Sequence, residues 1–453
     1  MKKYDVIIIG AGPAGIITGV TAKKVHPEKS MLMFKEEEKG LVPCGIPYIF
    51  HKLNSVEKNV MGPKPFIDLG GEVINDSAAD VNLHERKVTT TSGQTYEYDK
   101  LVFATGSKVV IPTFIPGYDL NRVYYIKKSY NYINRMFDEI QSLQHIVIVG
   151  GGFIGAEVAE QLALEPNKKV TLIESEEQCF SKAFSGDLSK IATDELRKTN
   201  VDVRTSVKVE KVNGTNGDVS SVSLSTGETI ECDAVLMAIG YRPNTELAAK
   251  AGLELNKTGA IKIDHYERTQ EPGVCAVGDC SQTTGFLTGR SDTVMLASTA
   301  TAEARVLGHN LFGVKIRKTF NGTLGVFSTE INGLAMAAAG VNETTAREAN
   351  IKILSAQFTD CDTHPDKFEE SSALSVKLFA SPCEGSILGG EVWGGKTAGE
   401  IINTISLAIQ KGVTVFELIS YQIGSHPLLT AAPTKTILIK AAEGIIHQIE
   451  NKK

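Results

Sequence analysis

Short runs of apolar residues alternate with helical patterns over the first two thirds of the chain. Two of these runs, residues 4–9 and 145–149, lead directly into a glycine-rich turn. A helical stretch follows each turn and extends to about Val25 in the first copy and about Leu164 in the second. An unbroken apolar run is typical of a strand that is buried on both faces of a parallel sheet. The pattern therefore predicts two strand–turn–helix units of an α/β fold.

The pattern changes beyond about residue 315. Residues 375–380 and 387–392 resemble antiparallel strands, and helical stretches follow at about 397–411 and 434–448. This arrangement predicts a separate α+β domain that begins near Asn321 and has the character of a subunit interface.

Both glycine-rich turns have GxGxxG spacing. The residues concerned are Gly10, Gly12, Pro13, Ala14 and Gly15 in the first turn, and Gly150, Gly152, Phe153, Ile154 and Gly155 in the second. In such a turn the first glycine permits a tight bend, the second lets the backbone approach a pyrophosphate, and the third lets the helix pack against the strand. The helix N-terminus then presents unpaired N–H groups to the phosphates. Two copies in this context predict two dinucleotide sites.

An acidic residue about twenty positions after the last glycine usually binds the adenosine ribose hydroxyls. Glu174 has this position in the second module, nineteen residues after Gly155, and acidic residues follow it. A 2′-phosphate would meet negative charge there, so NADH is favoured over NADPH. The first module has Lys35 at this place and Glu36 next to it. Either the register shifts so that Glu36 reaches the ribose, or Lys35 makes a different contact.

Composition narrows the functional class. The 453 residues are enough for about three domains, and a net charge of −6 argues against nucleic acid as a partner. No apolar run is long enough to span a membrane, and the start of the chain predicts no cleavable signal peptide. Seven cysteines without a repeating framework predict reduced thiols in the cytoplasm. We expect no metal site.

The segment 41–48 contains Cys44 between two prolines. Proline is common in a first helical turn, so we expect a helix to begin immediately after Cys44. A thiol at a helix N-terminus is stabilised as the thiolate, which is the reactive form. The alternative is that Cys44 is a small buried hydrophobic residue.

Three further motifs carry a family resemblance: Ala104-Thr105-Gly106, the segment 238–244 around Gly240, and the segment 274–279 that ends in Gly278-Asp279. With the two glycine turns, they make the chain resemble the flavin-dependent pyridine nucleotide–disulfide oxidoreductases over essentially its whole length. Within this family the Cys44 motif resembles the single-cysteine branch, which contains coenzyme A disulfide reductase, persulfide and polysulfide reductases, and NADH oxidase and peroxidase.

The resemblance implies a domain organisation and two cofactors. FAD would bind to a domain formed by residues 1–113 and 245–320, and NADH to residues 114–244, inserted within it. Residues 321–453 would form the dimerisation domain of a homodimer. Asp279 would bind the ribityl and pyrophosphate region of FAD, and the helix that begins at Ala297 would direct its N-terminus at the flavin pyrimidine edge.

The resemblance also makes Cys44 the redox-active residue. Relatives of the glutathione reductase type have a second cysteine five positions later, where this chain has Ile49. Cys44 would therefore cycle through a mixed disulfide, a persulfide or a sulfenic acid. We interpret the other six cysteines as structural.

Three functions follow from these features. The first is NADH-dependent reduction of low-molecular-weight disulfides, persulfides or polysulfides, of the coenzyme A type. The second is an NADH oxidase or peroxidase, against which Pro13 speaks, because those relatives have a histidine in the first turn. The third is a redox sensor or an electron donor to a partner protein, against which the full C-terminal domain speaks.

The roles of two lysines and of two histidines remain open within the first hypothesis. Lys23 and Lys24 have the position of basic residues that meet coenzyme A phosphates in the family, or are simply solvated. His426-Pro427 resembles the motif in which a histidine of the other subunit is the general acid–base, but Ala431 replaces its glutamate. His364 is a second candidate, and a plain surface histidine is the alternative for both.

Overall fold

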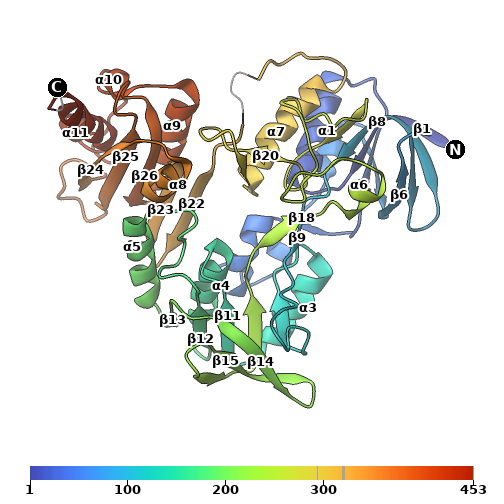
Figure 1. Ribbon diagram of the computed structural model, residues 1–453, viewed down its shortest axis with the longest axis horizontal. Coiled ribbons are helices and arrows are strands. Elements are labelled where there is room, and N and C mark those ends of the chain that lie inside the picture. The colour runs from blue at the N-terminus through green and yellow to red at the C-terminus, as the bar shows by residue number, and fades with distance from the viewer. Residues whose placement is uncertain (293, 319–321, 452–453) are drawn as a thin grey trace. The chain divides into compact units, whose positions relative to one another are not determined.

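The computed structural model describes residues 1–292, 294–318 and 322–451. It separates into two compact units, and the chain passes between them several times (Figure 1). Unit 1 consists of Met1–Gln144, Val212–Ser220 and Asp233–Thr323, and unit 2 of His145–Lys211, Ser221–Cys232 and Leu324–Lys453. The expected boundary between the FAD-binding domain and the dimerisation domain, at residues 320 and 321, lies outside the described residues. The three-domain division stays a prediction.

A seven-stranded sheet forms the centre of unit 1, with the strand order β5-β2-β1-β8-β7-β6 and with β19 also paired to β8. The strands β1, β2, β5, β8 and β19 pair in parallel, whereas β6 and β7 pair antiparallel. Their bounds are β1 Lys2–Ile9, β2 Met31–Lys35, β5 Glu72–Asn75, β6 Ala78–Asn82, β7 Lys87–Thr90, β8 Thr95–Phe103 and β19 Val274–Ala276.

Both faces of the parallel strands are buried, which explains the apolar run at residues 6–9 of β1. Ile7 and Ile9 belong to one core cluster, and Val6 and Ile8 belong to another that includes residues of α1 (Pro13–Val25) and α7 (Ala297–Asn310). These two helices lie side by side (Figure 1). They approach closely because Gly308 has no side chain: a Cβ there would lie 2.6 Å from Cβ of Thr21.

Unit 1 also contains the two segments by which the chain leaves and re-enters its main sheet. The strand β9 (Ser107–Val109) pairs antiparallel with β18 (Tyr241–Pro243), and β10 (Val123–Tyr125) pairs in parallel with β17 (Ala234–Met237). The remaining elements of this unit include β3 Gly40–Leu41, β4 Val60–Met61, α2 Lys64–Ile67, α3 Tyr130–Gln141, α6 Glu246–Lys250, β20 Thr283–Thr284 and β21 Ser291–Asp292.

Unit 2 contains the second strand–turn–helix motif. The strands β11, β12 and β13 pair in parallel, and the helix α4 follows β11 after the glycine turn. The bounds are β11 His145–Val149, α4 Phe153–Ala163, β12 Lys169–Ile173, α5 Gly186–Arg197 and β13 Val201–Arg204. Both predicted strand–turn–helix motifs are therefore confirmed.

The C-terminal part of unit 2 is a five-stranded antiparallel sheet of order β22-β23-β26-β25-β24. Its elements are β22 Val326–Ile331, β23 Leu334–Gly340, α8 Glu343–Ala349, β24 Leu354–Cys361, β25 Ala373–Ala380, β26 Ile387–Gly394, α9 Ala398–Lys411, α10 Val415–Leu418 and α11 Ile437–Glu450. The predicted α+β arrangement of antiparallel strands and helices is confirmed. The last helix begins three residues later than expected, because residues 433–435 form a separate 3-10 turn.

Two carboxylates of α4 bind this antiparallel sheet. Oε1 of Glu157 accepts a hydrogen bond from Oγ1 of Thr329 at 2.8 Å, and Oε1 of Glu160 accepts from N of Asn332 at 2.6 Å. The helix behind the second glycine turn is thus attached to β22 and to the turn that follows it.

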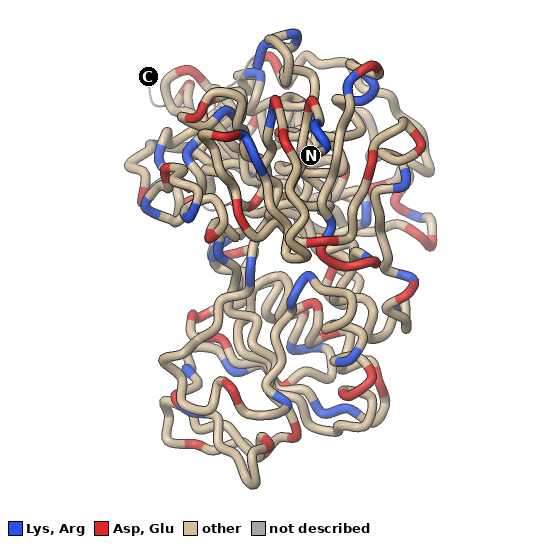
Figure 2. The backbone as a smooth tube through the Cα atoms, turned by 90° about the vertical axis from the view of Figure 1, so that its right-hand side faces the viewer, with Lys and Arg blue, Asp and Glu red and all other residues tan. Residues whose placement is uncertain are grey.

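Charged residues of both signs are distributed along the described chain. Figure 2 shows Lys and Arg interspersed with Asp and Glu along the chain. None of the helices in the described part of the chain is both long enough and apolar enough to cross a membrane.

Candidate active site

The first glycine turn is shaped by backbone contacts. Gly10 has a φ of +116°, and a Cβ added there would lie 2.2 Å from the carbonyl oxygen of Ala104. A Cβ on Gly15 would lie 2.0 Å from the carbonyl oxygen of Gly10, whereas a Cβ on Gly12 would meet no atom within 4 Å. Packing therefore requires the first and third glycines, while the second glycine opens onto free space. A turn that binds a pyrophosphate needs this arrangement.

Three segments converge beside this turn. A Cβ on Gly278 would lie 2.9 Å from Cβ of Ala14 and 3.4 Å from Cβ of Ala300, so the N-terminal turns of α1 and α7 both lie against it. Two helix N-termini near one point favour an anion there. The Ala104-Thr105-Gly106 motif lies beside the same turn through Ala104, and Oγ1 of Thr105 donates to the carbonyl oxygen of Asn244 at 2.6 Å, which ties the segment 238–244 to this motif.

Asp279 is held by two residues that the sequence does not point to. One carboxylate oxygen, Oδ2, lies 2.7 Å from Oγ of Ser107 and 2.7 Å from Nζ of Lys128. Ser107 directly follows the Ala104-Thr105-Gly106 motif, which is a weak signal, but Lys128 is 151 positions away from Asp279. These contacts fix the orientation of the Asp279 carboxylate.

The end of β2 has Lys35 at the place where an acidic residue usually binds the adenosine ribose. The amine of Lys35 donates to the carbonyl oxygen of Glu38, so it closes the local turn. Glu36 is exposed. Glu37 is half-buried and accepts from N of Asn131 at 3.2 Å and from Oγ of Ser129, at the start of α3. Lys35 therefore makes a local contact, and the binding of the adenosine ribose by Glu36 stays a prediction.

The second glycine turn is arranged like the first. A Cβ on Gly152 would meet no atom within 4 Å. Glu174, which follows β12, accepts from N of Gly151 at 2.5 Å through Oε2 and from N of Glu176 at 2.8 Å through Oε1. The structure thus brings Glu174 to the turn, as the nineteen-residue spacing predicts.

The expected helix after Cys44 is wrong. The chain forms two single 3-10 turns, Pro43–Gly45 and Pro47–Phe50, and Cys44 lies within the first. Pro47 explains the break, because it has no N–H for the carbonyl of Pro43 and its ring crowds that carbonyl. A helix dipole therefore does not account for a reactive thiol here.

The turn around Cys44 is nevertheless well fixed. The side-chain amide of the buried Asn59 donates to the carbonyl oxygen of Val42 at 3.0 Å, and a Cβ on Gly45 would lie 2.0 Å from Oδ1 of Asn59. Cys44 itself is exposed, so it is not the small buried residue of the alternative interpretation. Ile49, five residues later, is fully buried.

Most of the other cysteines are inaccessible. Cys179, Cys232, Cys275 and Cys280 are buried, Cys361 is half-buried and Cys383 is exposed. Burial raises the pKa of Cys179 and of Cys275 to about 12 and also raises the pKa of Cys280. These three thiols stay protonated at neutral pH and cannot serve as nucleophiles.

The two candidate histidines lie on neighbouring loops of unit 2. Nδ1 of His364 lies 2.8 Å from the carbonyl oxygen of Thr430, and N of His364 donates to the carbonyl oxygen of Pro427 at 2.9 Å. His364 thus holds the loop on which His426 lies. His426 is exposed, and its Nδ1 accepts from N of Leu428 at 3.3 Å. Of the two histidines, His426 is the more accessible one.

The adjacent lysines of α1 have different environments. Lys23 is buried, and its amine donates to the carbonyl oxygens of Pro27 and Lys29 at 2.8 and 2.9 Å. Lys24 is exposed and lines a groove of about 290 Å³ between α1 and α7. Arg305 and His309 line the same groove, together with the apolar residues Ile17, Val20 and Val25. Sequence reasoning missed Arg305 and His309, although their spacing of four residues puts them on one helix face.

The comparison with protein families decides the class of this protein. A model described as pyridine nucleotide-disulphide oxidoreductase matches residues 4–304, and the model of its dimerisation domain matches residues 326–437. The chain belongs to the pyridine nucleotide-disulphide oxidoreductase family.

Individual relatives share most of their length with this chain. An NAD(P)H sulfur oxidoreductase (CoA-dependent) from Pyrococcus abyssi is 31% identical over 83% of this chain and 84% of its own. An NADH oxidase from Enterococcus faecalis is 26% identical over 91% of this chain and 93% of its own. The solved structure of an NAD-dependent persulfide reductase from A. fulgidus superposes with a TM-score of 0.90 and 26% identity, over 98% of this chain and 84% of its own.

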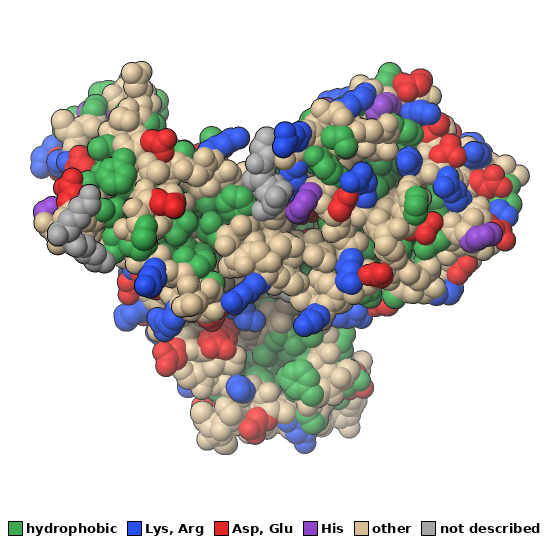
Figure 3. Space-filling view, turned by 45° about the horizontal axis from the view of Figure 1, so that its top comes forward, with side chains coloured by type: hydrophobic (Ala, Val, Ile, Leu, Met, Phe, Trp, Pro, Cys, Tyr) green, Lys and Arg blue, Asp and Glu red, His purple; other side chains and the backbone are tan. Residues whose placement is uncertain are grey.

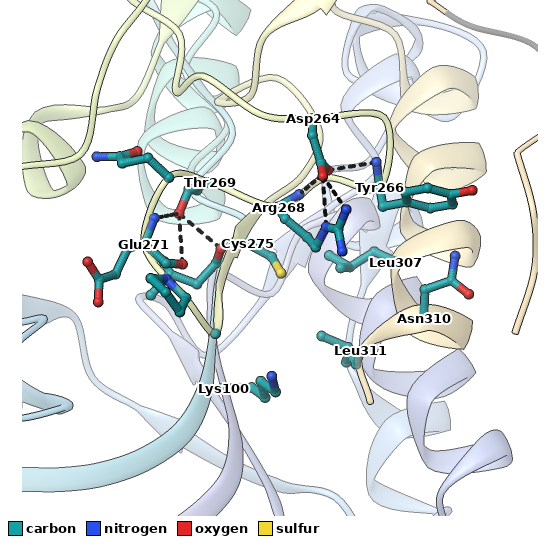
Figure 4. A pocket seen from close by; sticks show the side chains of 14 residues that line it. Lys100, Asp264, Tyr266, Arg268, Thr269, Glu271, Cys275, Leu307, Asn310 and Leu311 are labelled. Carbon is teal, nitrogen blue, oxygen red and sulfur yellow. Dashed lines mark hydrogen bonds and ion pairs between the residues drawn. The ribbon is translucent and has the colours of Figure 1, made fainter. Parts of the chain in front are cut away.

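Another pocket of this oxidoreductase lies at the C-terminal end of α7 and has a volume of about 300 Å³ (Figure 4). Nε of Arg268 lies 2.7 Å from Oδ2 of Asp264, and Cys275 lies in the wall. Because the thiol of Cys275 is protonated and Arg268 is already paired, this pocket offers neither a nucleophile nor an unpaired guanidinium. The glycine turn and Cys44 remain the better site for the redox chemistry of the family.

Thiol labelling of the native protein tests which cysteines are accessible and which are buried. We expect a small alkylating reagent to modify Cys44 and Cys383 first, and Cys179, Cys275 and Cys280 only after unfolding, because burial blocks access and keeps these thiols protonated. Peptide mass spectrometry at successive times measures the order. A matched Cys44→Ser variant should lose one of the early labels. Early labelling of Cys275 would contradict the structure.

Proposed function

We propose that the protein is an NADH-dependent flavoprotein reductase of low-molecular-weight disulfides, persulfides or polysulfides of the coenzyme A type, with Cys44 as its single redox-active cysteine. The observation that carries the proposal is an exposed cysteine on a fixed turn, in the same unit as the first glycine turn and without a second cysteine at position 49. The relative from Pyrococcus abyssi, named as a CoA-dependent sulfur oxidoreductase, supports the substrate class.

The residues of unit 1 fit FAD. The open space beside Gly12 admits a pyrophosphate, the converging N-termini of α1 and α7 favour its charge, and Asp279 offers a carboxylate to the ribityl hydroxyls. When bound, FAD supplies the two-electron chemistry that links NADH oxidation to sulfur reduction. Ala297, at the start of α7, would present backbone N–H groups to the flavin pyrimidine edge.

The second turn fits NADH. Its open glycine, Gly152, admits a pyrophosphate, and the Glu174 carboxylate beside it accepts from ribose hydroxyls. A cofactor with a 2′-phosphate would meet the negative charges of Glu174 and Glu176.

Cys44 would act as the nucleophile. Its thiolate attacks one sulfur of the substrate S–S bond, a mixed disulfide forms, and the other sulfur leaves as a thiolate. Two electrons then cleave the mixed disulfide, which restores Cys44 and releases the second thiolate. His426 of the partner subunit, in its imidazolium form, would be the general acid that protonates the leaving thiolates.

This role of His426 requires a homodimer. The match to the dimerisation domain supports one, and so do large apolar side chains exposed on unit 2, namely Phe368, Phe416, Tyr421, Leu428 and Leu429. Figure 3 shows apolar side chains on the surface of these C-terminal elements. A reducing, cytoplasmic setting suits a reaction that cycles one thiol.

The groove between α1 and α7 supports a substrate that carries phosphates. Lys24, Arg305 and His309 provide positive charge, and Ile17 and Val20 provide an apolar wall. Coenzyme A combines phosphates with apolar surface, so this lining favours coenzyme A disulfide or persulfide over inorganic polysulfide.

An NADH oxidase that cycles Cys44 as a sulfenic acid is the second candidate. The relative from Enterococcus faecalis bears that name, whereas Pro13 in the first turn disfavours the assignment. An electron donor to a partner protein would need neither Cys44 nor the dimerisation domain. Turnover of NADH with coenzyme A disulfide, coenzyme A persulfide, polysulfide, peroxide and oxygen separates these functions.

The protein should purify with about one FAD per chain, and Gly12→Val should lose it. The valine side chain would occupy the space of the pyrophosphate but meets no protein atom, so the fold should persist. Flavin absorbance and far-ultraviolet circular dichroism measure both properties. The matched control is Gly152→Val, which should keep its flavin. A yellow Gly12→Val protein would exclude FAD from the first turn.

NADH should be preferred to NADPH by roughly tenfold or more in kcat/KM, about 1.4 kcal/mol, because the Glu174 carboxylate binds the ribose diol and repels a phosphate. Glu174→Ala should narrow this gap, mainly through a higher KM for NADH. Steady-state kinetics with both cofactors measure it. Equal use of both by the wild type contradicts the assignment of Glu174.

Lys24→Gln should raise the KM for coenzyme A disulfide roughly three- to fivefold, the effect of one partly exposed ion pair of about 1 kcal/mol. The KM for polysulfide, which has no phosphate, should not change. Lys64→Gln removes an exposed lysine elsewhere in unit 1 and is the control. Equal changes for both substrates would mean that the groove does not bind phosphates.

Cys44→Ser should lose nearly all reduction of disulfides and persulfides, because a serine hydroxyl is not ionised near neutral pH and does not cleave S–S bonds. It should keep its flavin and some NADH-dependent reduction of dyes or oxygen. A long-wavelength absorption band between the thiolate and oxidised flavin should vanish with the thiol. Wild-type disulfide reduction by this variant would favour the electron-donor function.

A further inference from the structure

A buried carboxylate of the C-terminal sheet binds the beginning of α5. Glu391, on β26, is 1% exposed. Its Oε1 accepts from N of Ser185 at 2.5 Å, and its Oε2 lies 2.6 Å from Oγ of Ser185. Ser185 is the N-cap of α5, since its Oγ also accepts from N of Leu188 at 3.3 Å. Glu391 and Ser185 are 206 positions apart, so this contact ties two distant segments of unit 2 together.

The residues just before Ser185 pack against the second glycine turn. N of Phe180 donates to the carbonyl oxygen of Gly151 at 2.9 Å. The ring of Phe153, within the turn, lies 5.3 Å from the ring of Phe180 and 5.7 Å from that of Phe184. The ring of Phe327, on β22, stacks on that of Phe153 with the ring centroids 5.7 Å apart. The segment 180–185 therefore connects Glu391 with the turn directly.

We propose that Glu391 is a positioning residue for the second nucleotide turn: by holding Ser185 it holds the aromatic residues that shape the turn, and a change in the charge of Glu391 changes the affinity for NADH. This inference rests on the proposed function, in which the turn binds NADH.

The groups around Glu391 leave it with an excess of negative charge. Lys377, its cross-strand neighbour on β25, is the one nearby cation among the described contacts. Its amine lies 2.9 Å from Oδ2 of Asp187 in α5 and also contacts Oε1 of Glu343 in α8. One ammonium therefore faces three carboxylates, from α5, α8 and β26. A proton on Glu391 relieves this imbalance.

Burial raises the pKa of Glu391 from its ordinary value of 4.5 to about 7, and Glu343 acts in the same direction, while the bonds from Ser185 and the charge of Lys377 oppose the change. The arrangement that buries Glu391 is thus favoured by protonation of Glu391, and the two donors of Ser185 offset only part of this effect. Linkage sets the sign: this stabilisation is complete below about pH 4.5 and is lost as the pH rises through about 7. The second glycine turn should therefore keep the observed arrangement less well above about pH 7 than below it.

Glutamine at position 391 reproduces the protonated form. Its oxygen can accept from N of Ser185, and its amide can donate to Oγ of Ser185, at every pH. Glu391→Gln therefore separates protonation from packing.

The experiment measures the Kd of NADH from the concentration dependence of rapid flavin reduction between pH 6.0 and 8.5. For the wild type we expect the Kd to rise about threefold or more across this range. Glu391→Gln should stay near the low-pH value throughout. The control Glu384→Gln removes an exposed carboxylate of unit 2 and should follow the wild type. Glu303 and Glu267 of unit 1 also have a raised pKa, about 7 and about 8, and the comparison between variants removes their contribution.

A second variant protects the test against a folding defect. Ser185→Ala removes one donor to the ionised carboxylate, so the midpoint of the pH transition should move upward. A wild-type pH profile in Glu391→Gln overturns the proposal, and so does an unchanged midpoint in Ser185→Ala if Glu391→Gln does not fold. If NADH fails to reduce the wild-type flavin at any pH, the proposed function itself fails. Normal reduction with identical profiles in all variants sinks this inference alone.

Discussion

Contact between backbone atoms at the first glycine turn is the constraint on which unit 1 depends. Gly10 lies against the carbonyl of Ala104, and Gly15 lies against the carbonyl of Gly10, so neither position tolerates a side chain. This close approach sets the distance between α1 and the sheet. It also brings Ala14 within reach of Gly278, and thereby places Asp279 and the start of α7 beside the same turn. The close approach of these segments follows from the absence of a few Cβ atoms, and the polar contacts with Ser107 and Lys128 then orient Asp279.

Local patterns predict local structure well in this chain. The bounds of β11 and α9 and the position of Glu174 at the second turn follow from residue spacing, because strands, turns and helix caps are determined over a few residues. Contacts between distant segments are not predictable in this way. The contacts of Lys128 with Asp279 and of Ser185 with Glu391 join residues 151 and 206 positions apart, and neither leaves a periodic signal. The error at Cys44 is local: Pro47 stops the helix that Pro43 begins.

Burial, more than residue type, separates the chemical roles of like side chains. Lys23 and Lys24 are adjacent, yet one closes the end of α1 against backbone carbonyls and the other lines a groove, because successive helical residues point about 100° apart. The cysteines divide in the same manner. Cys275 and Cys280 lie inside the core with protonated thiols, while Cys44 lies on an exposed turn held by Asn59. A sequence motif names the candidate, and the surroundings decide whether it can react.

The attachment of α4 to the antiparallel sheet has a consequence for protein engineering. The carboxylates of Glu157 and Glu160 satisfy Thr329 and the backbone of Asn332, so the second glycine turn and the C-terminal sheet have complementary surfaces. A chimera that takes residues 145–211 from one relative and the C-terminal sheet from another would leave the half-buried Glu157 and the buried Glu160 opposite foreign partners. The second nucleotide module of this protein is therefore better exchanged together with its C-terminal sheet than as the segment that the nucleotide motif delimits.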